Sequence, residues 1–221
     1  MPRDFRSNKS NLVDMTKKIT GTIENIEISK LVEHEDNEWL FGMNDIEVLA
    51  ESISTNGFHG AIEVYNLDNN VYEIASGHRR VRACKMLGLK EIPCTIKSTY
   101  KTQSERNEWL LDSNLKQRGG FIGFSPIHVA RMINWYVEKV FTEQQELKTE
   151  KSNKKKAIAQ KFNMSEGLVY KYQAINSYIV PIQEKIENGI SFSAFYGLQN
   201  KDIAFQEAVN KGIDDIISKD G

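Results

Sequence analysis

The segment Ser76–Arg80, with the sequence SGHRR, has the residue types of an anion-binding turn. It lies between a predicted strand that ends near Ala75 and a predicted helix that begins near Arg79. The backbone N–H groups at a helix start and the conformational freedom of glycine both suit a phosphate group. Arginine guanidinium groups add paired hydrogen bonds to phosphate oxygens. Arginines at a helix start can equally be solvated or paired with acids, so this segment alone leaves both interpretations open.

A second segment, 157–172, has the spacing of a helix-turn-helix. Such a motif needs a small residue where the helices cross, a turn residue that tolerates positive φ and a β-branched core residue in the second helix. Ala159, Asn163 and Val169 supply them, and they correspond to positions 5, 9 and 15 in the numbering of the helix-turn-helix motif. Asn enters the left-handed region more readily than most non-glycine residues, and Ser165 can cap the second helix. An ordinary pair of packed helices is the alternative.

In a helix-turn-helix the second helix enters the major groove with its first residues near base edges. Here that helix is expected over about 166–173, with Leu168, Val169 and Tyr172 facing inward. Lysines nearby are expected to touch phosphates, which positions a protein without reading sequence. The predicted DNA contacts are Lys154, Lys155, Lys156, Ser165, Glu166, Gly167, Tyr170 and Lys171, and Lys161 is a further predicted phosphate contact.

The charge of the chain is unevenly distributed. The net charge is -1, but residues 31–51 carry seven acids and no Lys or Arg, whereas residues 151–173 carry six lysines and one acid. A basic stripe is often only a solvated helix face. Because this one coincides with the helix-turn-helix spacing, it favours DNA as the partner.

Length and composition restrict the class of protein. A chain of 221 residues has room for one large domain or two smaller ones. Its apolar runs are shorter than the roughly 20 residues that cross a bilayer, and the N-terminus has no secretory signal pattern, so a cytoplasmic protein without a membrane span is expected. Cys84 and Cys94 lack C-x-x-C spacing and are expected to be reduced thiols in the interior.

Local patterns divide the chain into four parts. Residues 1–20 read as a tail. Residues 21–118 read as an α+β domain, with strands near 23–28, 61–65, 71–75 and 92–96 and helices near 44–57, 79–87 and from 104. After the glycines and proline of 119–126, residues 119–200 read as an all-α domain, with one long helix over about 127–147 and a polar connection over 148–154. Residues 201–221 read as a short helix or tail.

The order of these features resembles the ParB family of bacterial partition proteins, over about residues 21–200. The matching segments are 49–53 followed by Gly57, the box at 77–83, Ile92-Pro93, the box at 114–118 that leads into Ser125-Pro126, and the helix-turn-helix. The resemblance implies a ParB/sulfiredoxin-like α+β domain that binds CTP with Mg²⁺, followed by an all-α helix-turn-helix domain that recognises DNA and can clamp around it.

The resemblance also assigns individual residues and partners. The implied nucleotide-binding residues are Gly77, His78, Arg79, Arg80, Asn114 and Arg118, with Asn114 also a metal ligand. No catalytic residue is assigned. The implied partners are double-stranded DNA with a palindromic site, a ParA-like ATPase and a second copy of the chain on DNA. The implied place of action is the nucleoid or a plasmid in the cytoplasm.

Four positions depart from the family pattern. His78 replaces a glutamate, Ser113 stands where an acid precedes Asn114, Ala61 replaces a proline, and one extra residue separates Asn114 from Arg118. CTP hydrolysis is therefore expected to be slow or absent. The alternative is that Asp112, one residue away, compensates for the missing carboxylate, and the extra residue before Arg118 is compatible with such a shift. The stretch after Asn200 is too short for the usual dimerisation domain, so a free protein that is mainly monomeric is expected.

Two other functions fit parts of this pattern. One is a transcriptional regulator that keeps the fold without using a nucleotide. The other is a phosphotransfer enzyme with the sulfiredoxin fold, because His78-Arg79 resembles part of the sulfiredoxin Cys-His-Arg motif. Gly77 occupies the place of that cysteine, which removes the nucleophile.

Overall fold

The computed structural model describes residues 23–97, 102–146 and 154–219. Its internal contacts divide the chain into two compact units. Of the described residues, the α/β unit contains 23–35 and 43–97, and the helical unit contains 36–42, 102–146 and 154–219. The predicted tail at 1–20 and nearly all of the predicted connection at 148–154 lie outside the described residues.

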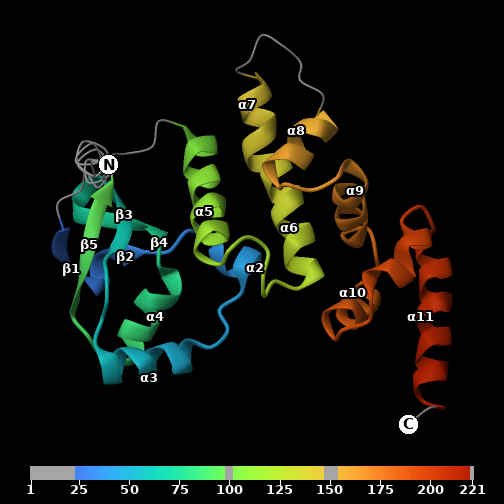
Figure 1. Ribbon diagram of the computed structural model, residues 1–221, viewed down its shortest axis with the longest axis horizontal. Coiled ribbons are helices and arrows are strands. Elements are labelled where there is room, and N and C mark those ends of the chain that lie inside the picture. Colours follow the sequence, from blue (N-terminus) through green and yellow to red (C-terminus); the bar gives the residue numbers. More distant parts are fainter. Residues whose placement is uncertain (1–22, 98–101, 147–153, 220–221) are drawn as a thin grey trace, which may run out of the picture. The chain divides into compact units, whose positions relative to one another are not determined.

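The α/β unit is built on one mixed sheet of five strands in the order β1-β5-β3-β4-β2 (Figure 1). β3 is antiparallel to β4 and β1 is antiparallel to β5, whereas β3 pairs with β5 and β2 with β4 in parallel. The predicted turn between β3 and β4 is confirmed, because Asn69 and Asn70 adopt positive φ there, a conformation that Asn tolerates. The strands are β1 (Ile23–Glu27), β2 (Leu31–Val32), β3 (Ile62–Leu67), β4 (Val71–Ser76) and β5 (Glu91–Lys97), and the short helical turns are η1 (Ile28–Lys30) and η2 (Asp68–Asn70).

Two helices complete the α/β unit. Val81 and Cys84 of α4 (His78–Met86) pack into the apolar core of the sheet, which includes Ile62 and Cys94. α3 (Ile46–Asn56) then packs on α4 through the small side chains Ala50 and Ala83. Both cysteines are buried and unpaired, as expected, and burial raises the pKa of Cys94 to about 11.

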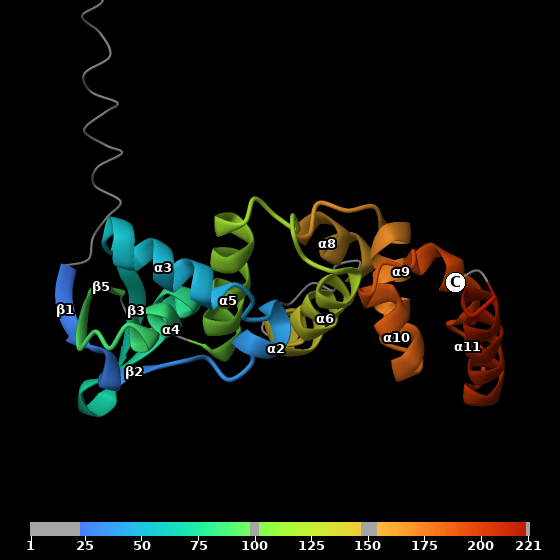
Figure 2. The same cartoon turned by 90° about the horizontal axis from the view of Figure 1, so that it is seen from below.

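The helical unit contains the rest of the described chain. The predicted long helix runs without a break and contains one π-helical turn. At this turn Asn107 Nδ2 donates to the Lys139 carbonyl at 3.3 Å. α6 packs against α9 in both views (Figures 1 and 2). The elements are α2 (Asn37–Phe41), α5 (Gln103–Gln117), α6 (Pro126–Tyr136), η3 (Val137–Phe141), α7 (Thr142–Glu146), α8 (Lys154–Lys161), α9 (Glu166–Ile175), α10 (Val180–Glu187), η4 (Phe192–Leu198) and α11 (Ile203–Ile217).

The C-terminal helix α11 belongs to the core of the helical unit. Gln206 is buried, its Oε1 accepts from the Ile179 backbone at 2.9 Å, and its Nε2 donates to the carbonyls of Ser177 and Lys201. Val209 and Ile213 pack against the same core as α10. In the described part of the chain, every helix is too short or too polar to cross a bilayer.

The predicted fold class, an α+β domain followed by helices, is confirmed. α5 packs with the later helices, whereas the glycines and proline of residues 119–126 predicted a domain boundary after residue 118. The boundaries of the functional domains stay a prediction.

Candidate nucleotide and DNA sites

A tight strand-to-helix turn at Gly77 forms the core of the candidate anion site. β4 ends at Ser76, Gly77 has φ 106°, and α4 begins at His78. A Cβ at Gly77 would lie 2.5 Å from Ile62 Cδ1 and 3.1 Å from Arg80 Nη2. Only glycine fits this conformation and this space, and the turn presents the first N–H groups of α4 to an approaching anion.

Arg79 carries an unsatisfied donor in this turn. Its Nη2 donates to the Asn44 carbonyl at 2.8 Å and lies 3.9 Å from the Asp45 carboxylate. Its Nε is buried and has no hydrogen-bond partner among the described residues. A buried N–H without an acceptor costs free energy, so an acceptor supplied by a ligand, such as a phosphate oxygen, fits here.

Arg80 holds the loop that precedes β3. Its Nη1 donates to the His59 carbonyl and its Nη2 to the Ala61 carbonyl, both at 3.2 Å, and its guanidinium carbon lies 5.6 Å from the centroid of the Phe58 ring. Burial lowers the pKa of Arg80, but an arginine stays protonated at neutral pH. Arg80 therefore shapes the loop at residues 58–61 beside Gly77.

His78 is directed into the interior. Its side chain is buried, and its Nε2 accepts a hydrogen bond from the His34 backbone at 3.4 Å. Burial lowers the pKa of His78 to about 3, and His34 and Arg82 act in the same direction, so the ring is neutral at physiological pH. The His78 ring is therefore enclosed by the core and its acceptor is already used, so a nucleotide contact of His78 would be made by its backbone N–H, and this assignment stays a prediction.

Asn114 and Arg118 lie at the C-terminal end of α5, in the helical unit. Asn114 Nδ2 donates to the Leu110 carbonyl at 2.9 Å, and the guanidinium carbon of Arg118 lies 4.4 Å from the centroid of the Phe124 ring. The structure thus brings Gly77, Arg79 and Arg80 together in the α/β unit. The assignment of Asn114 and Arg118 to the same nucleotide stays a prediction.

The residues around Asn114 do not fit a metal ion held by a protein carboxylate. Ser113 Oγ donates to the Leu110 carbonyl at 3.2 Å. The carboxylate of Asp112, the expected substitute, lies 2.8 Å from Lys161 Nζ and is committed to that ion pair.

The helix-turn-helix geometry predicted from the sequence is confirmed. α8 and α9 are joined through Asn163, which adopts φ 50°. Ser165 Oγ accepts from the Leu168 backbone at 3.2 Å and caps α9. Ala159 and Val169 are buried, as the motif requires.

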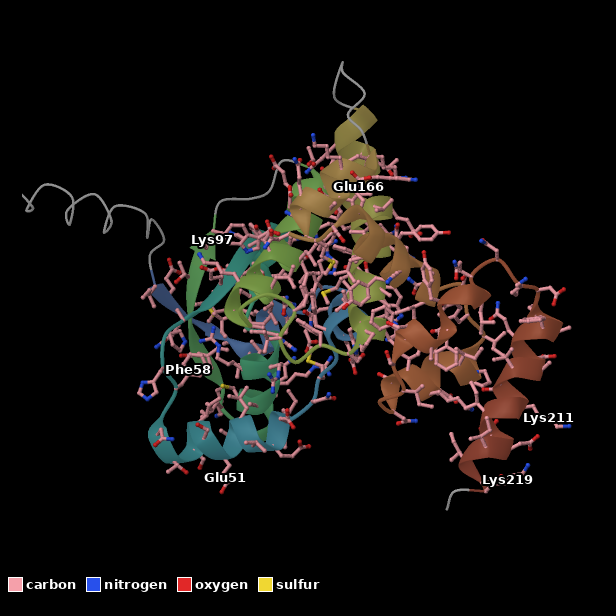
Figure 3. The ribbon with its side chains drawn as sticks, turned by 45° about the vertical axis from the view of Figure 1, so that its right-hand side comes forward. Glu51, Phe58, Lys97, Glu166, Lys211 and Lys219 are labelled. Carbon is pink, nitrogen blue, oxygen red and sulfur yellow. The ribbon has the colours of Figure 1, made fainter. Side chains whose placement is uncertain are left out.

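The outer face of α9 carries the predicted base-reading residues. Glu166 (Figure 3), Gly167 and Tyr170 are exposed, and Lys171 Nζ lies 5.2 Å from the centroid of the Tyr196 ring. Lys154, Lys155 and Lys156 are exposed at the start of α8. The sequence reasoning missed Tyr196, an exposed aromatic residue of η4, because no local pattern connects η4 with α9.

Tyr172 and Lys161 are inward-facing members of the same motif. Tyr172 stacks on Phe192 with ring centroids 5.1 Å apart, which agrees with the predicted interior position. Lys161 Nζ lies 2.6 Å from Glu108 and 2.8 Å from Asp112. The prediction of Lys161 as a phosphate contact is therefore corrected, because its charge is already neutralised inside the helical unit.

Comparisons with known proteins agree with this organisation. Residues 13–114 match the family model of the ParB N-terminal domain. A probable chromosome-partitioning protein ParB of Vibrio cholerae is 48% identical over 52 residues, which are 24% of this chain and 18% of that protein. A nucleoid occlusion protein of Bacillus cytotoxicus is 33% identical over 92 residues, which are 41% of this chain and 32% of that protein.

A solved structure extends the likeness to the helical unit at the level of fold. It is the C-terminally truncated ParB of Caulobacter crescentus complexed to the centromeric parS site, with a TM-score of 0.53 and 18% identity over 86% of this chain and 92% of that one. The sequence matches cover less than a third of the length of the Vibrio and Bacillus relatives. Residues 13–114 therefore match the ParB N-terminal domain, and the chain as a whole shares its fold with the truncated Caulobacter ParB.

Proposed function

We propose that this protein binds DNA and acts in the partition of a chromosome, a plasmid or a mobile element, with CTP binding as a switch. The observation that carries the proposal is the capped helix-turn-helix of α8 and α9 in a chain that also has a ParB N-terminal domain. The names of the relatives support it, since one is a probable chromosome-partitioning protein and the structure with the same fold was solved on a parS site.

In this proposal the two helices of the motif have different tasks. The first two turns of α9, with Glu166, Gly167 and Tyr170 exposed, read base edges in the major groove. Lys154, Lys155 and Lys156 bind phosphates at the start of α8, and binding therefore weakens as salt rises, because the release of counterions into a more concentrated salt solution is less favourable.

The nucleotide is proposed to place its phosphates at the Gly77 turn. The unsatisfied Nε of Arg79 and the N–H groups of α4 are the donors, and Arg80 keeps the adjoining loop in place. CTP is the nucleotide expected from the family resemblance. Its negatively charged triphosphate would accept hydrogen bonds from these donors. Asn114 is the residue that would hold Mg²⁺ by the family resemblance. Ser113 has no carboxylate, and the carboxylate of Asp112 is paired with Lys161. Hydrolysis is therefore slow or absent.

The remaining partners follow from the DNA proposal. A palindromic site is read by two copies of the chain, because the symmetry of the DNA mirrors that of the protein. A ParA-like ATPase is the expected partner in partition, and the place of action is the nucleoid or a plasmid in the cytoplasm.

The proposal is tested by selection from a pool of short duplexes of randomised sequence. The full chain should enrich one palindromic sequence and bind it more tightly than an unrelated duplex, with affinity that falls steeply with salt. No enrichment, together with no binding to any duplex at low salt, would refute the DNA-binding function.

A second measurement addresses the nucleotide. Calorimetry should show binding of CTP in preference to ATP, GTP and UTP, and phosphate release should be slow with DNA present. If the enriched duplex binds but CTP does not, the chain is a regulator that has lost nucleotide use.

A further inference from the structure

Three charged side chains connect α5 to the first helix of the helix-turn-helix. Lys161, at the end of α8, lies 2.6 Å from the Glu108 carboxylate and 2.8 Å from the Asp112 carboxylate, both on α5. The two acids are four residues apart and therefore lie on one face of α5. We call this group, Lys161 with Glu108 and Asp112, the α5–α8 clasp.

The clasp is supported by two more helices. Gln144 Nε2, on α7, donates to Glu108 Oε2 at 2.8 Å, and Lys161 Nζ lies 5.5 Å from the centroid of the Tyr136 ring on α6. Only 18% of the Lys161 side chain is exposed. Burial lowers the pKa of Lys161, but the hydrogen bonds and charges of Asp112 and Glu108 outweigh burial, so the pKa is raised and the ammonium keeps its charge.

The orientation of α8 depends strongly on such contacts. α8 has eight residues, and a helix of this length is marginal unless other elements hold it. Its buried side chains are Ile158 and Ala159, with Phe162 directly after it. Apolar contacts of this size are not directional. An ion pair with two acids on one face of α5 restricts both the position of α8 along α5 and the rotation of α8 about its own axis.

We propose that Lys161 is a positioning residue for DNA binding, which holds α8, and through the Asn163 turn also α9, in the orientation that reads DNA without touching the DNA itself. This inference rests on the proposed DNA-binding function. Its physical basis is that removal of the lysine breaks both ion pairs and leaves the partly buried Glu108 carboxylate, 31% exposed, without its cation. α8 then shifts away from α5, and α9 shifts with it.

The test compares Lys161→Met in two backgrounds, wild type and Glu108→Gln/Asp112→Asn. The probe is the duplex selected by the wild-type full chain, and affinity is measured by fluorescence anisotropy over a range of salt concentrations. Lys161→Met should weaken binding on the order of tenfold and leave the slope of affinity against salt unchanged. In the double-acid background the same change should cost little more, because the clasp is already broken. Lys161→Arg should restore most of the affinity.

A direct phosphate contact gives a different result. Loss of one phosphate contact would reduce the salt slope by about 0.9 and would weaken binding equally in both backgrounds. Either of these outcomes overturns the inference, and so does wild-type affinity in Lys161→Met.

Lys185→Met is the matched control. Lys185 is also a partly buried lysine, 2.7 Å from Asp214 and 2.8 Å from Asn210, and it connects α10 to α11. This variant should lose thermal stability but keep its affinity for the duplex. If Lys161→Met does not fold, as judged by circular dichroism, Glu108→Gln and Asp112→Asn replace it, and unchanged affinity in both would refute the inference. A wild-type chain that selects no duplex refutes the proposed function, and the inference with it.

Discussion

Acidification should destabilise the α/β unit through the buried histidine His78. The pKa of His78 is lowered from 6.5 to about 3 in the folded protein by burial, with His34 and Arg82 adding to the effect. Below about pH 6.5 the unfolded chain binds a proton that the folded chain rejects, so stability falls as the pH falls. The loss stops near the folded pKa, and above the unfolded pKa this histidine contributes no pH dependence.

The size of the effect follows from the shift. Each pH unit inside this window is worth about 1.4 kcal/mol, so a change from about pH 6.5 to about pH 5 should remove about 2 kcal/mol. That is a large part of the stability of a small domain. His78→Gln should flatten this part of the pH profile, because a Gln oxygen can accept the His34 N–H without taking up a proton.

The assay must report on the α/β unit alone. All three tryptophans, Trp39, Trp109 and Trp135, lie in the helical unit, so their fluorescence in a urea titration serves as an internal reference. Amide hydrogen exchange of peptides from β4 and α4 reports on the α/β unit. Equal loss of protection in wild type and His78→Gln between neutral pH and about pH 5 would show that His78 does not carry the effect.

Three further changes test the two sites. Arg80→Ala should abolish CTP binding, and Arg80→Lys should weaken it strongly because a lysine cannot hold both loop carbonyls; calorimetry in which Arg80→Lys binds like wild type would contradict this. Ser165→Ala should remove the cap of α9 and cost about 1 kcal/mol in the free energy of unfolding, and an unchanged urea midpoint of tryptophan fluorescence would refute it. Replacement of Lys154, Lys155 and Lys156 by Gln should weaken binding to all duplexes alike and reduce the salt slope by about 3, whereas a change in base preference with an intact slope would assign these lysines to base reading.

Local sequence patterns predicted the fold correctly where a residue and its immediate neighbours determine the backbone conformation. The β3–β4 hairpin follows from its two asparagines, and the turn of the helix-turn-helix follows from Asn163 and Ser165, because each of these residues acts on its own backbone or on the next turn. α2 was not predicted. It has only five residues, and the Asp36 carboxylate that precedes it accepts a hydrogen bond from Trp135 Nε1 at 2.8 Å, a residue far along the chain.

The inward side-chain directions of His78 and Lys161 were not predicted, because their partners lie far away in the sequence. His78 and Lys161 have polar side chains in motifs that bind ligands, and their types alone suggest exposure. Their partners, His34 and Glu108, are 44 and 53 residues away in the sequence. For Lys161 a signal was available, because Glu108 and Asp112 are spaced to share one helix face. For His78 no local signal existed.

The departures from the family pattern at 78 and 113 have different physical consequences. A carboxylate in the enclosed place of His78 would lose its hydration, and charged groups are rarely buried without a partner. The neutral imidazole instead accepts one backbone N–H and needs no counterion. At the end of α5, Ser113 and Asn114 each donate to the Leu110 carbonyl, and Asp112 is held by Lys161. The Gly77 turn therefore has an unpaired donor suited to a phosphate, whereas Ser113, Asn114 and Asp112 of α5 offer no uncommitted carboxylate to a metal ion.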